Sequence, residues 1–186
     1  MSKFQLVCGL LNPRLKAMYS KDFDGATAVI AAPFNRYLPN ETPDVSNAQI
    51  ADIAGKICKQ VGLAFLGQGE QVDILDSRVC SVRYRSQAGA WVQTHVLVRW
   101  IAAEVLKLGK GSTVVLVGHP HHVRRISLLA RYYRLNPLVS ARCESVPYDG
   151  SDREGAQWWC KSVWRYIPWE YASRAVLIAK LLMGQI

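Results

Sequence analysis

Short runs of apolar residues alternate along the chain with longer stretches in which apolar residues recur every three or four positions. The run ATAVIAAPF, residues 26–34, ends at a proline and a polar loop, and it predicts a buried strand. The run TVVLVG, residues 113–118, is the clearest strand in the chain, because every residue before its glycine is β-branched or apolar. Runs of this length, bounded by turn residues, are typical of strands that are buried on both faces.

Three longer stretches follow the helical period instead. Residues 46–62 place isoleucine, alanine and valine at helical spacing, with Ser46 or Asn47 as the predicted cap and a glycine as the last residue. Residues 92–108 and 120–133 repeat the pattern, and the second of these begins with a proline, which suits a first helical turn. We therefore expect three amphipathic helices that each cover a sheet.

The remaining segments complete the architecture. QVDILD, residues 71–76, and SARCESVPY, residues 140–148, alternate enough to predict two further strands. The aromatic-rich tail, residues 155–186, predicts a short helix, a break at Pro168 and a last amphipathic helix. Strands that alternate with helices predict one α/β domain over residues 1–186, a three-layer Rossmann-like fold with a mainly parallel sheet and helices on both faces.

Composition narrows the classes of partner. Twenty-three lysines and arginines against 14 aspartates and glutamates give a net charge of +9, which favours an anionic partner. Half of the residues are hydrophobic, which excludes a disordered chain. Five widely spaced cysteines without a CxxC pair favour reduced thiols and a cytoplasmic location. No apolar run approaches the ~18 residues that a membrane span needs.

The strongest candidate for chemistry is GHPHHVRR, residues 118–125, directly behind the clearest strand. It holds three of the four histidines of the chain and two adjacent arginines. Ligands of parallel sheets bind at the carboxyl ends of strands, and the start of a helix favours an anion. The position therefore predicts an anion-binding corner, or an acid–base site in which His122 exchanges a proton. We expect no metal, because no further ligand stands at metal-binding spacing.

Two other basic stretches leave alternatives open. RVCSVRYRSQ, residues 78–87, carries Arg83 and Arg85, and either would complete the anion pocket if the strand ends beside the histidines; the alternative is a solvated basic loop. The tail interleaves tryptophan and tyrosine with lysine and arginine, which fits single-stranded nucleic acid, a peripheral membrane contact or simple cover over the sheet. Within the tail, Glu170 is predicted to be a buried carboxylate that pairs with an arginine, and Arg174 stands one helical turn further on.

The stretch VVLVGHPHHVRRISLLARYY, residues 114–133, resembles a unit of the SanA/ElyC/YdcF-like family, a bacterial domain of unknown function with a Rossmann-like sheet. That unit is a strand followed by His-x-x-Arg at the start of a helix, and His122 and Arg125 stand at the motif positions. The upstream helix of the family begins with a threonine-containing segment, which Thr94 matches. The tail also contains the Trp-Glu pair that often precedes the last helix of the family.

The resemblance covers about residues 70–184 and stops short of the first third of the chain. Gly118 and His119 replace the usual Thr-Ser at the end of the strand, and the glycine-rich loop that follows the first strand in many members is absent. These departures weaken a hydroxyl–phosphate role at the strand end.

The resemblance implies a nucleotide-like or phosphorylated ligand at the strand ends, with S-adenosylmethionine as one option, and a link to envelope biogenesis. Its motif puts His122 and Arg125 first among the ligand-binding residues, and Thr94, His119 and Arg83 follow. The expected partner is an anionic small molecule rather than nucleic acid. Two alternatives stay open: a hydrolase or transferase that acts on a phosphorylated substrate through His122, and an adaptor for nucleic acid or a membrane surface through the tail. The sequence names no cofactor and no oligomeric state.

Overall fold

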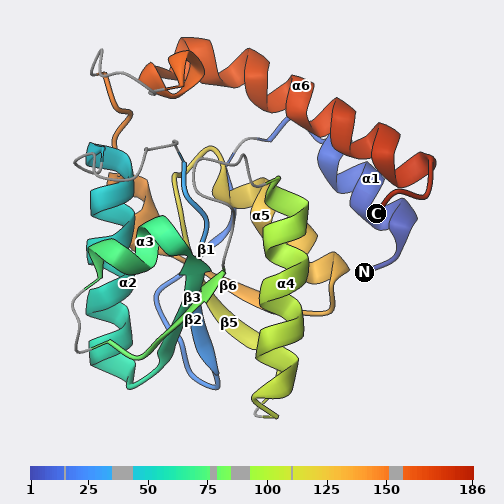
Figure 1. The fold of residues 1–186 in the computed structure, drawn as a ribbon. Helices are drawn as coiled ribbons and strands as arrows, with labels where there is room; N and C mark the ends of the chain where they lie inside the picture. The colour runs from blue at the N-terminus through green and yellow to red at the C-terminus, as the bar shows by residue number, and fades with distance from the viewer. Residues whose placement is uncertain (15, 35–43, 76–78, 85–92, 110, 151–156) are drawn as a thin grey trace.

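Six strands, all parallel, form one sheet in the order β1-β6-β5-β2-β3-β4 in the computed structural model (Figure 1). The strands are β1 (Tyr19–Ser20), β2 (Ala28–Ala31), β3 (Ala64–Gln68), β4 (Ser81–Tyr84), β5 (Thr113–Val117) and β6 (Asn136–Ser140). The structure describes residues 1–14, 16–34, 44–75, 79–84, 93–109, 111–150 and 157–186. The two predicted apolar runs became the two central strands, β2 and β5, and their side chains are buried because helices cover both faces.

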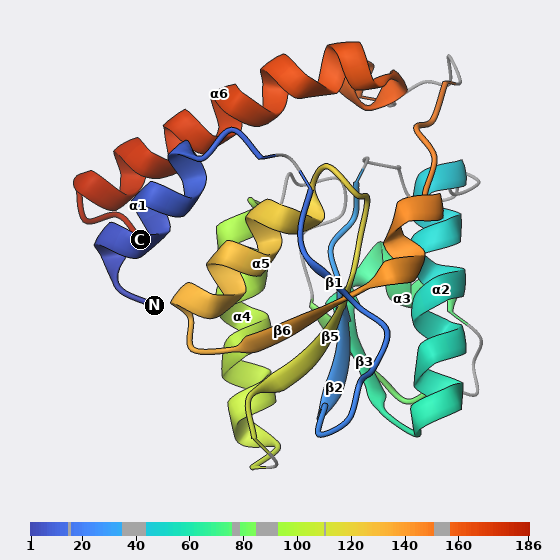
Figure 2. The ribbon, with the colours of Figure 1, turned by 180° about the vertical axis from the view of Figure 1, so that it is seen from behind.

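Helices cover both faces of the sheet, so the molecule is an α/β protein with a three-layer Rossmann-like fold. The helices are α1 (Lys3–Leu11), α2 (Val45–Val61), α3 (Gly69–Ile74), α4 (Thr94–Lys107), α5 (Val123–Tyr132) and α6 (Val163–Leu182), with two 3₁₀ helices, η1 (Ala141–Ser145) and η2 (Trp158–Lys161). α2 and α3 lie on one face, and α4 and α5 lie on the other (Figures 1 and 2). α1 and α6 lie side by side outside α5, and α6 crosses above the sheet (Figure 2).

The start of α2 is tied to the end of β2. Asp44, rather than the expected Ser46 or Asn47, is the cap, and its carboxylate accepts hydrogen bonds from the backbone N–H and the side-chain amide of Asn47, both at 2.7 Å. The side-chain oxygen of Asn47 in turn accepts the backbone N–H of Phe34 at 3.0 Å. The predicted glycine stop is correct, since Gly62 closes the helix with φ of +66°.

Three sequence-based expectations were wrong. QVDILD is not a strand, because its residues 71–74 belong to helix α3 and Leu75 caps that helix. Val72 and Leu75 pack on the core at helical spacing, and Asp76 lies outside the described residues. The strand near 140–148 lies earlier, over β6, because the Ser140 hydroxyl accepts the N–H of Arg142 and turns the chain into η1. Helix α1 was not expected at all.

The third error is the break at Pro168. α6 runs unbroken over 20 residues with Pro168 inside it. A proline removes one backbone hydrogen bond, and the carbonyl that would have accepted it belongs to Trp164, an exposed residue whose carbonyl can bond to water. Buried contacts on both sides of Pro168, from Tyr166 to Leu181, hold the two halves of the helix in line.

Among the described helices, none is both long and apolar enough to cross a membrane.

Replacing Gly67 and Gly55 by alanine is expected to change the free energy of unfolding in opposite directions. A Cβ on Gly67 would lie 2.5 Å from the ring of Phe65, which is fully buried and cannot yield, so Gly67→Ala should lower the free energy of unfolding by about 1–3 kcal/mol. A Cβ on Gly55, inside α2, would meet only Leu75 at an ordinary 3.5 Å, so Gly55→Ala should raise it by roughly 0.5–1 kcal/mol. Urea denaturation measures both changes, and equal signs for the two variants would contradict the packing described here.

Candidate functional site

The strand order places a reversal of chain direction between β2 and β5. From β2 the chain moves outward through β3 to β4, and it then returns across the sheet through α4 to β5, on the other side of β2. Open α/β sheets bind ligands outside the carboxyl ends of the strands at such a point. Here the residues that follow β2, ending at Phe34, and those that follow β5, beginning at Gly118, come together there.

His119 lies at the centre of this meeting point. Its ring stacks on Phe34 with centroids 3.6 Å apart and an angle of 11°, and the ring of Tyr148 meets it edge-on at 4.3 Å. Its side chain is fully buried. Burial, and secondarily His121, lowers the pKa of His119 to about 2. His119 is therefore a neutral imidazole at physiological pH.

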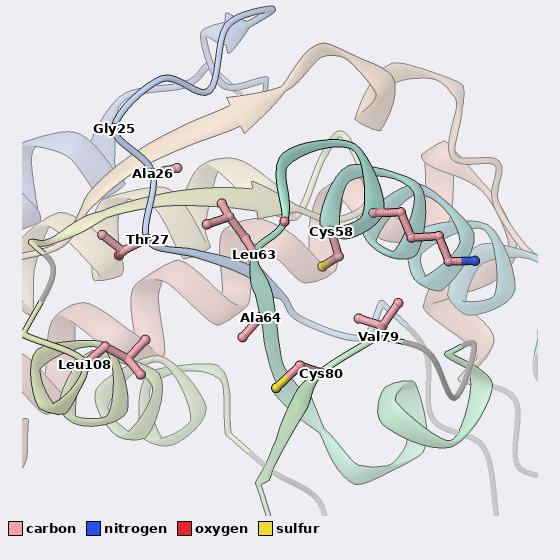
Figure 3. Close-up of a pocket in the computed structure, with 11 residues that line it drawn as sticks. Gly25, Ala26, Thr27, Cys58, Leu63, Ala64, Val79, Cys80 and Leu108 are labelled. Carbon is pink, nitrogen blue, oxygen red and sulfur yellow. The ribbon is translucent and has the colours of Figure 1, made fainter.

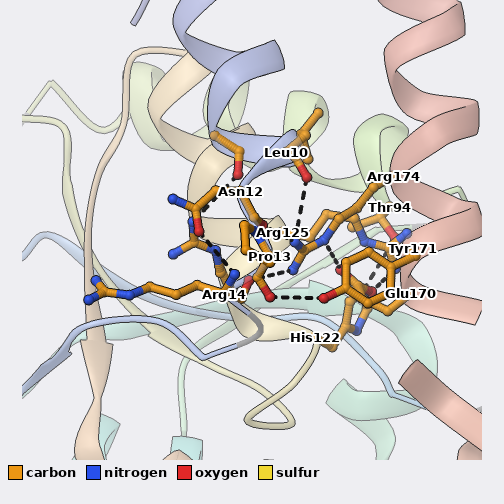
Figure 4. A network of polar contacts seen from close by, with 12 residues as sticks. Leu10, Asn12, Pro13, Arg14, Thr94, His122, Arg125, Glu170, Tyr171 and Arg174 are labelled. Carbon is orange, nitrogen blue, oxygen red and sulfur yellow. Dashed lines mark hydrogen bonds and ion pairs between the residues drawn. The ribbon is translucent and has the colours of Figure 1, made fainter. Parts of the chain in front are cut away.

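His122 forms the first residue before α5 and is also buried. Its Nε2 atom lies 3.5 Å from the hydroxyl of Thr94, the first residue of α4, so the structure brings together two of the predicted ligand-binding residues (Figure 4). Burial, then the charge of Arg125, holds the pKa of His122 well below its ordinary value. His122 is thus a second neutral imidazole beside the first.

Arg125 does not stand free: it is paired with a carboxylate from α6 (Figure 4). One of its terminal nitrogens lies 3.3 Å from Glu170, which also accepts the Nε–H of Arg174 at 3.0 Å and the hydroxyl of Tyr166 at 2.9 Å. Glu170 is fully buried. The predicted pairing of Glu170 with Arg174 is confirmed, and Arg125 is a second partner that the sequence did not indicate.

Arg174 extends this cluster to the N-terminal segment. Its terminal nitrogens donate to the backbone carbonyls of Asn12 at 2.9 Å and Arg14 at 3.1 Å, and the hydroxyl of Tyr171 donates to the carbonyl of Pro13 at 2.9 Å (Figure 4). A single helix, α6, therefore fixes the histidine segment and the chain that follows α1.

Unsatisfied polar atoms concentrate in the histidine–arginine segment. Among the described residues, eight buried side-chain nitrogen and oxygen atoms have no hydrogen-bond partner, and four of them lie between positions 119 and 125. These four are His119 Nε2, His122 Nδ1, Arg124 Nε and Arg125 Nε. Each buried polar atom without a hydrogen-bond partner lowers the stability of the fold by about 1–3 kcal/mol. This concentration of such atoms therefore marks a position where a ligand would supply the missing hydrogen bonds.

The other candidates lie elsewhere. Arg83 is on the edge strand β4, with β2 and β3 between it and β5, and it forms an ion pair with Asp73. Its neighbour Arg85 falls outside the described residues. His121 points to the hydroxyl of Tyr148, 2.6 Å away. No three His, Cys, Asp or Glu side chains of the described segments lie close enough together to hold a metal.

Sequence reasoning missed the aromatic part of the site. Phe34, Tyr148 and Tyr166 surround the ring of His119, and Tyr166 comes from α6, far along the chain. One signal for Phe34 was available, because it follows the apolar run of β2 just as the histidines follow β5. Nothing in the sequence joined these two strand ends.

A separate cavity of about 660 Å³ opens at the amino ends of the strands (Figure 3). Apolar and glycine residues line most of it, and Lys59, Cys58 and Cys80 add an amine and two thiols. It lies at the end of the sheet opposite to the histidines, where parallel sheets do not usually bind ligands.

Comparisons with known proteins found no matching family model, no matching curated protein and no matching solved structure.

The buried carboxylate of α6 predicts a large loss of stability on neutralisation. Glu170→Gln leaves Arg125 and Arg174 without a counter-charge in a buried setting, which should cost about 3–5 kcal/mol of unfolding free energy. The matched control is Asp52→Asn, which breaks the exposed pair with Lys56 and should cost under ~1 kcal/mol. Urea denaturation measures both, and similar small losses would show that the cluster does not hold α6.

The buried histidines predict stability that falls in acid. His119 stays neutral in the fold down to about pH 2 but takes up a proton near pH 6.5 when unfolded, so its contribution is complete above pH 6.5 and is lost as the pH falls below it. Between pH 7.5 and 5.0 this loss is about 2 kcal/mol for His119 alone. His119→Phe, which keeps a ring against Phe34, should flatten the pH dependence by that amount in urea denaturation. A slope identical to wild type would contradict a neutral, buried His119.

Proposed function

We propose that the protein binds a phosphorylated or nucleotide-like small molecule at the carboxyl ends of β2 and β5, and that S-adenosylmethionine is one ligand of this class. The observation that supports it is the group of three buried, unpartnered polar atoms, His119 Nε2, His122 Nδ1 and Arg125 Nε, which follow β5 at the point where the strand order reverses. The resemblance to the SanA/ElyC/YdcF-like family agrees with this position, since its motif selects His122 and Arg125.

The unpartnered atoms suit an oxygen-rich ligand. A neutral imidazole nitrogen either donates or accepts one hydrogen bond, and the Nε–H of Arg125 donates. Phosphate and ribose oxygens supply the complementary acceptors and hydroxyls. Two arginines share the single carboxylate of Glu170, so the cluster keeps an excess positive charge that favours an anion. Binding would give hydrogen-bond partners to His119 Nε2, His122 Nδ1 and Arg125 Nε without first breaking the ion pairs.

Binding is a better account than acid–base catalysis. A general base works best when its pKa lies near the operating pH, and burial holds the pKa of His119 and His122 far below that. A hydrolase or transferase that uses His122 would first have to raise its pKa. The groups as they stand provide hydrogen bonds rather than proton exchange.

The cellular setting is part of the same proposal. All five cysteines are free, which agrees with reduced thiols in the cytoplasm. A role linked to envelope biogenesis, which the family resemblance implies, would then concern a cytoplasmic precursor or its regulation.

Titration of inorganic phosphate, ATP, S-adenosylmethionine and ribose 5-phosphate tests the proposal. At least one should bind in isothermal calorimetry and, at about 100 times its Kd, stabilise the fold by about 2.7 kcal/mol, which raises the melting temperature by roughly 5–10 °C. His119→Phe should abolish this shift, because the ring stays but its nitrogen atoms are gone.

The control for this experiment is Arg83→Ala. Arg83 lies on the edge strand and should leave the affinity unchanged. Absence of binding by every probe, or equal affinity of wild type and His119→Phe, refutes the proposed site.

A further inference from the structure

The outward face of α6 is almost entirely apolar. Of its charged residues, Glu170 and Arg174 are buried, Lys180 is half-buried, and only Arg165 is exposed. The exposed positions recur at helical spacing along the helix: Trp164, Pro168, Tyr171, Ala172, Ala175, Val176, Ala179 and Leu182. The side chain of Trp164 is 82% exposed and that of Leu182 is 72% exposed. A surface helix normally turns a charged face to water, so this face is unusual for a helix that is covered on one side alone.

Helix α1 lies beside α6 (Figures 1 and 2), and it too exposes apolar residues. Leu6 and Leu10 face inward and are buried, whereas Phe4, Cys8 and Leu11 lie one turn apart on the exposed side. Phe4 is 76% exposed. Two adjacent helices therefore present large apolar side chains to the surroundings, and exposed apolar side chains gathered on neighbouring elements mark interaction sites.

The same two segments carry a one-sided charge. Residues 1–16 and 157–186 together contain seven lysines and arginines and one acidic residue, the buried Glu170. Lys16 has an exposed partner in Glu144, at 4.0 Å. Of these seven basic residues, four are exposed, namely Lys3, Arg14, Lys16 and Arg165, and no acidic side chain of these two segments is exposed.

A cluster of arginines lies next to this surface. Arg124, at the start of α5, is partly exposed, and a terminal nitrogen of its guanidinium donates to the carbonyl of Gly9 in α1. Burial, followed by the charges of Arg174, Arg14 and Arg131, lowers the pKa of Arg124. Arg124 thus lies among like charges beside α1, where the phosphate of a lipid headgroup would relieve their repulsion.

We propose that α1 and α6 dock the protein on the surface of a membrane that contains anionic phospholipid. The apolar side chains enter the boundary between headgroups and acyl chains, and the surrounding lysines and arginines contact the phosphates. α6 lies in the plane of the surface, because Glu170 and Arg174 bind its other face to the body of the protein.

Charge favours a bilayer over a second copy of this chain. A symmetric dimer through this face would bring the same basic residues of both copies together, and it would bury no acidic side chain against them. An anionic bilayer covers the apolar side chains and neutralises the basic ones at the same time.

Vesicle co-sedimentation of the full chain tests this docking. Binding should be at least about tenfold stronger to phosphatidylcholine vesicles with 30% phosphatidylglycerol than to phosphatidylcholine alone, and 0.5 M salt should weaken it. Trp164→Glu and Leu182→Glu, both on exposed positions, should each weaken binding about tenfold or more. Leu106→Glu is the matched control, since Leu106 is 57% exposed on α4, and it should bind as wild type.

Circular dichroism and the melting temperature establish that each variant is folded. Equal binding by Trp164→Glu and Leu106→Glu, or no binding to either vesicle, overturns the proposal. Light scattering without lipid measures the oligomeric state. If the wild type is a dimer and Trp164→Glu is a monomer, the face serves self-association, and the proposal is overturned. Salt-sensitive binding to a single-stranded oligonucleotide in place of vesicles also overturns it.

Discussion

One buried carboxylate holds the upper part of the molecule together. Glu170 accepts from Arg125 on α5 and from Arg174 and Tyr166 on its own helix, and it is shielded completely from water. A buried charge is tolerated only when partners surround it, so these contacts must form together or not at all. α6 is thereby fixed above the strand ends, where Tyr166 contributes to the aromatic wall beside Phe34. The positions of both the histidine site and the apolar outer face of α6 therefore depend on this carboxylate.

The site separates charge from hydrogen bonding. Arg125 and Arg174 share the one carboxylate of Glu170, which leaves one positive charge in excess, while His119 Nε2, His122 Nδ1 and Arg125 Nε still lack hydrogen-bond partners. A ligand therefore gains from neutralising this charge and also from completing hydrogen bonds, which depend on the direction of each group. Such a site selects ligands by the placement of their oxygens.

Features that depend on neighbouring residues could be predicted from the sequence better than contacts between segments that are far apart along the chain. β2 and β5 were predictable because a strand buried on both faces needs a continuous apolar run, and the pair Glu170–Arg174 followed from helical spacing. The contact of Glu170 with Arg125 and the remoteness of Arg83 both depend on the order of strands in the sheet, which no residue period encodes. The predicted helix break at Pro168 was wrong because the effect of a proline depends on which carbonyl loses its hydrogen-bond donor. Here that carbonyl belongs to Trp164, which is exposed to water.

The first residues of the chain find their partners only near its end. β1 pairs with β6, α1 packs on α5 and α6, and Arg174 bonds to carbonyls 160 and 162 positions earlier. During synthesis this apolar segment completes its contacts only after α5, β6 and finally α6 have been made. Contacts of such long sequence separation slow folding and extend the time for aggregation.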